Sequence, residues 1–204
     1  MAGASDPGAE LRALAAETPV EPRRVARFLD GLAPAERVAA VRSLGRAEQR
    51  RLFEAVAGAL PLGLADLVPP ATVDLAPVRH YGRNTLPAFT IFEKRFCRPR
   101  GADREKPGEL WGYNHQSTSW LTGPGYFVAA PDPGRTEVLI DYTRLPSGRA
   151  EGWPEIRPND RGLARFVYGF MVDRLRRVSE HVTIGSAARH GRDLGSWFAL
   201  CREA

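Results

Sequence analysis

Residues 125–143, GYFVAAPDPGRTEVLIDYT, carry the clearest structural signal in the chain. Two apolar runs, residues 125–130 and 136–143, are separated by PDPGR, in which proline and glycine occupy positions that tight turns favour. The pattern predicts two strands joined by a hairpin. Because short connections produce antiparallel pairing, the hairpin also indicates the type of sheet in this part of the chain.

Four further segments have the composition and alternation of strands. They are residues 87–97, 109–117, 181–187 and 194–203. The last two flank ARHGRD, which predicts a second hairpin. In the segment 109–117, a side-chain period of two places Trp111, Tyr113 and His115 on one face.

The segment that follows residue 160 is predicted to be a long helix. Asn159 or Asp160 is a suitable N-cap, and Arg174, Arg176 and Arg177 would lie in the last turns, where cations offset the helix dipole. Its apolar stripe comprises Leu163, Phe166, Val167, Phe170, Met171 and Val178. The sequence therefore predicts an α+β fold: a largely antiparallel curved sheet, or partly closed barrel, of about six strands with one long packed helix.

The N-terminal third is predicted to be a segment of short helices, residues 1–68. The stretches LAPAERVAAVRS and LGRAEQRRLFEA align at a period of 12, and each has a helix breaker, Pro34 or Gly45, before an Ala-Glu pair. Two copies are too few for a solenoid, so a compact helical segment that covers part of the sheet is expected. A proline-rich linker, residues 69–78, then leads to the sheet domain, residues 79–204.

The composition indicates a globular protein: 204 residues, 43% hydrophobic and 26% charged. The net charge of +5 rests almost entirely on dispersed arginines, with two lysines and no basic block, which argues against nucleic-acid binding. No segment approaches the roughly 18–20 apolar residues of a membrane span, and the first residues lack the apolar core of a signal peptide. A cytoplasmic location is therefore expected.

Several kinds of site find no support in the sequence. The four histidines have no metal-binding spacing, so no metal site is predicted, and the cofactor is left open. Ser117 and Ser119 lie near His115 without a nucleophile-elbow motif. Gly123-Pro124-Gly125 is not a phosphate loop, because Pro124 has no N–H to donate.

Charged residues within aromatic strands are the strongest sign of a site. Glu93, Lys94 and Arg95 interrupt FTIFEKRF, and Asp141 interrupts VLIDY. Buried charges cost several kcal/mol unless they are paired. These residues therefore lie either on a solvated outer face or in a polar patch within an apolar cavity.

The cavity interpretation makes His115 and Asp141 the acid/base pair. The ligand-binding residues would be Trp111, Tyr113, Tyr126, Tyr142 and Trp153. The loop 144–160 would act as a lid.

Two functional hypotheses follow. The first is a cytosolic ligand-binding domain that holds a mostly apolar small molecule in a curved-sheet cavity, with acid/base chemistry at His115 and Asp141 as its catalytic extension. The alternative is an interaction or scaffold protein that docks a protein partner through residues 1–68 and an arginine-rich surface.

Overall fold

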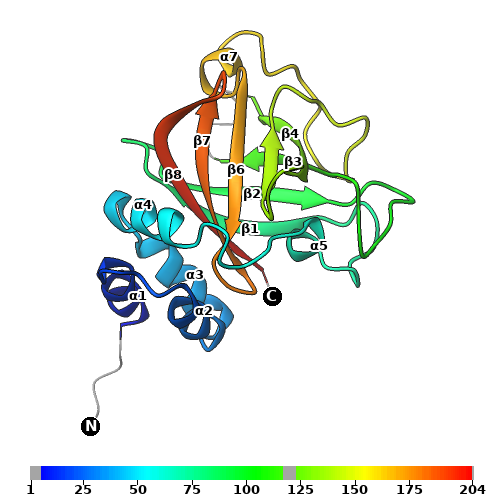
Figure 1. Ribbon diagram of the computed structural model, residues 1–204. Coiled ribbons are helices and arrows are strands. Elements are labelled where there is room, and N and C mark those ends of the chain that lie inside the picture. The colour runs from blue at the N-terminus through cyan, green and yellow to red at the C-terminus, as the bar shows by residue number, and fades with distance from the viewer. Residues whose placement is uncertain (1–5, 117–122, 204) are drawn as a thin grey trace.

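Eight antiparallel strands form a closed barrel in the computed structural model, which describes residues 6–116 and 123–203 (Figure 1). Each strand pairs with the next along the chain, and β1 pairs with β8 to close the ring. The strands are β1 (Val78–Asn84), β2 (Ile91–Cys97), β3 (Leu110–His115), β4 (Tyr126–Pro131), β5 (Val138–Asp141), β6 (Met171–Arg177), β7 (Val182–Arg189) and β8 (Arg192–Arg202). This is the up-and-down barrel arrangement.

The six strands that the sequence predicts correspond to β2–β5, β7 and β8. Both predicted hairpins are confirmed, since β4 pairs with β5 and β7 pairs with β8. The prediction of about six strands is wrong because it lacks β1 and β6. These two strands complete the ring, β1 between β2 and β8 and β6 between β5 and β7.

The predicted long helix is also wrong. Only α7 (Ala164–Val167) is helical, and Phe170, with a φ of 60°, separates it from β6. Met171 and Leu175 are four residues apart, a spacing that puts two side chains on one face of a helix and equally on one face of a strand. The arginines of this segment do not cap a helix, because Arg174 and Arg176 pair instead with Glu137, at 3.0 and 2.8 Å.

The N-terminal helices cover the outer face of β7 and β8 (Figure 1). They are α1 (Pro7–Ala16), α2 (Pro22–Asp30), α3 (Pro34–Ser43) and α4 (Arg46–Ala55). Their apolar side chains, such as Leu29 and Val41, form one core with outward-facing Ile184 and Ala199 of the barrel. No helix in the described ranges combines the length and the apolar composition that a membrane-spanning helix needs.

One end of the barrel is filled by the segment around α5 (Leu64–Leu67). Leu62, Leu64 and Leu67 join the core of the barrel interior. Nε2 of His80, an inward residue of β1, donates to the carbonyl of Leu67 at 3.0 Å. Burial lowers the pKa of His80 to about 3, so the ring is neutral and acts as a packed hydrogen-bond donor. The interior therefore has a filled end, and α7 lies at the other end of the barrel.

Candidate functional site: a cavity with a buried polar cluster

A cavity of about 440 Å³ lies inside the barrel, and Phe166 and Val167 of α7 line one end of it. Its walls are mostly apolar and come from the β1–β2 connection, from α7 and from the inner faces of β2, β6, β7 and β8. The apolar lining residues are Leu86, Ala88, Phe89, Phe92, Phe166, Val167, Met171, Ala187, Leu194, Trp197 and Phe198. The volume lies within the roughly 300–1,000 Å³ typical of small-molecule sites.

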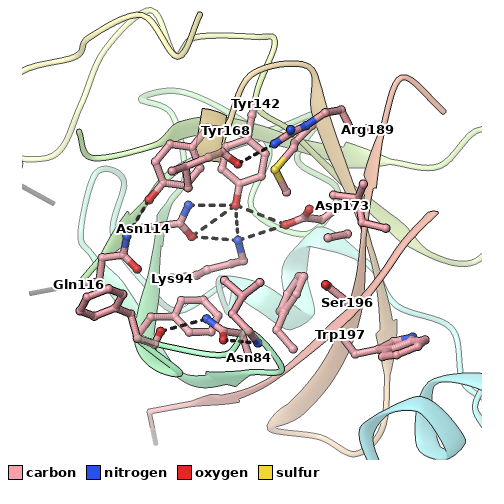
Figure 2. A pocket seen from close by; sticks show the side chains of 18 of the residues that line it. Asn84, Lys94, Asn114, Gln116, Tyr142, Tyr168, Asp173, Arg189, Ser196 and Trp197 are labelled. Carbon is pink, nitrogen blue, oxygen red and sulfur yellow. Dashed lines mark hydrogen bonds and ion pairs between the residues drawn. The ribbon is translucent and has the colours of Figure 1, made fainter. Parts of the chain in front are cut away.

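Four buried polar side chains meet at the inner end of this cavity (Figure 2). They are Lys94, Asn114, Tyr142 and Asp173, and each is less than 5% exposed. The strand register brings them together. Lys94 of β2 lies opposite Asn114 of β3, and Asp173 of β6 lies opposite Ile140 of β5, two residues before Tyr142. We refer to these four residues as the inner cluster.

The Lys94 ammonium is the centre of the inner cluster. Nζ donates to Oδ1 of Asn114 at 2.9 Å and to the Tyr142 hydroxyl, and it lies 3.4 Å from Oδ2 of Asp173. Nδ2 of Asn114 also donates to the Tyr142 hydroxyl, at 3.0 Å. The three donors of an ammonium group therefore all have partners.

Aromatic rings surround the Lys94 ammonium. Their centroids lie 4.8–5.7 Å from Nζ, a distance at which a ring face attracts a cation. The rings are those of Phe92, Phe127, Tyr142 and Phe198. Two inward glycines make room for them: a Cβ at Gly112 would come within 2.4 Å of the Phe127 ring, and one at Gly185 within 2.2 Å of the Phe198 ring.

Burial acts on every titratable member of the inner cluster. It lowers the pKa of Lys94 and raises the pKa of Asp173, and in each case the opposite charge of the partner resists the shift. Burial and the Asp173 carboxylate together raise the pKa of Tyr142 well above its ordinary value, so the phenol keeps its proton.

One oxygen of Asp173 is left without a partner. Oδ2 faces Lys94 and the Tyr142 hydroxyl, whereas Oδ1 is buried and makes no hydrogen bond to any residue that the structure describes. A buried acceptor that lacks a donor costs about 1–3 kcal/mol. This oxygen belongs to a residue that lines the cavity, so a group bound there can satisfy it.

The mouth of the cavity is apolar and exposed. Leu86, Phe89, Phe166 and Leu194 line the cavity, and their exposed fractions run from 45 to 74%. An exposed apolar patch that continues into an apolar cavity is typical of a ligand entrance. Polar groups at the wall include Arg189, which donates to the carbonyl of Phe166 at 2.9 Å.

His115 and Asp141 lie outside the cavity. Both point to the outer face of the barrel, on β3 and β5, which are separated by β4. From the register we estimate that they are on the order of 15 Å apart. Asp141 accepts from the backbone N–H of Thr143 at 2.8 Å and from its hydroxyl at 2.6 Å, as a turn residue does. The structure thus gives this pair no shared site, and Ser117 lies, like Ser119, outside the described residues.

The predicted ligand-binding aromatics separate into two places. Tyr142 lines the cavity. The other four, Trp111, Tyr113, Tyr126 and Trp153, pack together on the outer face of the barrel with Cys97 and Ala150. We refer to these four aromatics as the outer cluster.

The loop 144–160 covers this outer cluster and not the cavity mouth. Trp153 packs edge-on against Tyr113 with ring centroids 4.9 Å apart, and the Tyr126 hydroxyl donates to the carbonyl of Pro154 at 2.5 Å. Asn159, expected to cap a helix, instead donates to the carbonyls of Tyr126 and Tyr142, at 2.6 and 2.8 Å. These hydrogen bonds fasten the loop to the barrel wall.

Besides Tyr142, the sequence singles out one member of the inner cluster, Lys94, but predicts no role for it. Lys94 stands in a charged triplet, and only the parity of β2 decides that Lys94 points inward while Glu93 and Arg95 pair with each other outside, at 2.8 Å. The signal that was available is FxKxF, Phe92-Lys94-Phe96, in which a lysine shares a strand face with two phenylalanines. Asp173 is not among the predicted site residues, because the sequence predicts a helix where the structure has β6.

No group of three histidine, cysteine or acidic side chains suited to a metal ion occurs within the described part of the chain. A scan of the sequence against models of known protein families finds no match, and a search of curated proteins finds none either. The functional argument therefore rests on the cavity and the inner cluster.

Proposed function

We propose that the protein binds a mostly apolar small molecule inside the barrel, with the polar group of that molecule against the inner cluster. One observation carries this proposal: an apolar cavity of about 440 Å³ ends on four buried polar side chains, one of which has an unpartnered carboxylate oxygen. An eight-stranded barrel is wide enough to hold one small ligand, as lipocalins do. That likeness concerns the architecture alone.

The chemistry of the inner cluster favours a ligand with a neutral polar group. Lys94 and Asp173 form an ion pair whose charges cancel, so a ligand carboxylate or ammonium would meet a partner already neutralised. A hydroxyl group fits better, because it can donate to Oδ1 of Asp173.

The scaffold alternative has less support. The apolar faces of α1–α4 are used against the outer face of β7 and β8, so a protein partner would have to bind their polar surface. The cytoplasmic location stays a prediction from the sequence.

Thermal unfolding with decan-1-ol, an apolar chain with one hydroxyl, tests the proposal. Ligand that binds only the folded chain raises Tm, by about 5–10 °C at roughly 100 times Kd for a domain of this size. The matched variants are Ala187→Phe, which places a ring in the cavity between Asp173 and Ser196, and Ala188→Phe, which places it on the other side of β7. The shift should vanish in A187F and persist in A188F.

Two results would contradict the proposal. One is the absence of any shift in the parent protein with alcohols, amides and fatty acids of varied chain length. The other is an equal shift in A187F and A188F, which would place the binding site outside the cavity.

A further inference from the structure

Lys94 is a primary amine at the inner end of an apolar cavity. It is 2% exposed, lines the cavity and stands between Phe92 and Phe96 on the inner face of β2. An amine in such a place is shielded from bulk water but open to a ligand in the cavity. Desolvated lysines of this kind are the amines that proteins use to form Schiff bases with carbonyl compounds.

The ion pair with Asp173 can become a neutral pair by one proton transfer. Nζ of Lys94 and Oδ2 of Asp173 are 3.4 Å apart, so the ammonium proton can move to the carboxylate. Burial shifts the two pKa values toward each other, and an apolar ligand that excludes water from the cavity strengthens this effect. The products are an amine with a free electron pair and a carboxylic acid beside it, the nucleophile and the acid that carbonyl addition needs.

Oδ1 of Asp173 supplies the second observation. It is buried on a residue that lines the cavity and has no hydrogen-bond partner among residues 6–116 and 123–203. The hydroxyl that forms when an amine adds to a carbonyl group is a donor that this oxygen lacks. The Tyr142 hydroxyl, which holds its proton, is a second donor for the carbonyl oxygen.

We propose that Lys94 takes up an apolar aldehyde or ketone in the cavity as an imine, with Asp173 as its proton partner. This rests on the proposed function and specifies its ligand class: a single carbonyl group on an apolar body that fits the walls of the cavity. Asn114, Tyr142 and Asp173, which contact Nζ, then position the amine and the carbonyl group that react.

The reaction balances without any other reagent. The Lys94 electron pair forms the C–N bond, and the carbonyl π pair moves to oxygen, which takes the proton of Asp173. The nitrogen proton returns to the Asp173 carboxylate, leaving a neutral carbinolamine. Asp173 then protonates the hydroxyl, which leaves as water while the nitrogen pair forms C=N. The protonated imine keeps the Asp173 carboxylate as its counter-ion, so the site has the same charges as before.

Decanal with borohydride reduction tests this inference, because reduction converts an imine into a stable secondary amine. The chain has two lysines, and the exposed Lys106 is an internal control for ordinary surface reactivity. Mass spectrometry and peptide mapping should find one decyl group on Lys94, formed at least about tenfold faster than on Lys106. Excess decan-1-ol should suppress labelling of Lys94 and leave labelling of Lys106 unchanged.

Three variants sharpen the test. Lys94→Met should lose the adduct at position 94, and a cooperative thermal transition measured without ligand checks that this variant is folded. Lys106→Arg should keep the adduct at Lys94. Asp173→Asn should slow its formation about 10²-fold, because the proton donor is lost.

The outcomes separate the two proposals. If decan-1-ol raises Tm but decanal labels Lys94 no faster than Lys106, the imine inference fails and ligand binding stands. If neither compound binds, both fail. An unchanged rate in D173N would remove Asp173 from the chemistry.

Discussion

The outer cluster is made of four aromatic side chains and the inner cluster of four polar ones, and the two lie on opposite sides of the barrel wall. In the outer cluster, Tyr113, Tyr126 and Trp153 fill the space between the barrel wall and the loop 144–160. In the inner cluster, polar groups equally buried face a cavity of about 440 Å³. Aromatic and polar residues next to packed chain contribute stability, whereas those beside open space are available to bind a ligand.

The largest effect is expected when the ion pair of the inner cluster is broken. Asp173→Leu leaves the Lys94 amine without its carboxylate, and removing one member of a buried pair costs about 3–5 kcal/mol. The double variant Lys94→Met with Asp173→Leu should recover most of this, since an apolar pair of similar volume needs no charge partner. Urea denaturation measures both free energies of unfolding. A double variant as unstable as the single one would show that the two residues are not coupled.

Trp153→Ala tests the outer cluster. Trp153 is 4% exposed, and loss of a buried tryptophan side chain costs about 3 kcal/mol or somewhat more. Because the ring lies outside the barrel, the affinity for decan-1-ol should stay the same at temperatures where the variant is folded. Trp153→Phe, with a smaller loss, is the control. If Trp153→Ala lost its affinity for decan-1-ol but kept its stability, the outer cluster would contribute to ligand binding as well.

His80 lies inside the barrel but at its filled end. A change at this residue should therefore alter the free energy of unfolding and leave ligand binding unchanged. Its pKa is lowered to about 3 by burial, so the unfolded chain binds a proton that the folded chain excludes at any pH between that value and about 6.5. Stability should therefore fall by about 1.4 kcal/mol per pH unit as the pH drops through this window. His80→Phe should remove that part of the slope in denaturation measured from pH 7 downward, and an unchanged slope would contradict it.

The smallest effect is expected at His115. Its side chain is exposed on the outer face, so His115→Ala should change the free energy of unfolding by no more than about 0.5 kcal/mol. The Kd for decan-1-ol should not change either. Weaker binding in this variant would restore the role that the sequence suggested and would extend the functional region beyond the cavity.

Local signals in the sequence predicted most of the strands. The PDPGR turn predicted the β4–β5 hairpin, and alternation over residues 109–117 predicted β3, because both depend on neighbouring residues only. β6 could not be recognised in this way, since Met171 and Leu175 satisfy a helical period and a strand period alike. The choice was made by pairing with β5 and β7.

By itself, the sequence determined that the chain contains antiparallel hairpins and that charges interrupt its aromatic strands. Only the tertiary structure decided which charges are inside. A period of two defines two faces of β2 without saying which one faces the barrel interior. The outer face of the barrel is covered in places as well, over β7 and β8 by the N-terminal helices and over the outer cluster by the loop 144–160. Hydrophobicity on both faces therefore hides the distinction. Closure of the barrel places Lys94 and Asp173 together inside and leaves His115 and Asp141 outside.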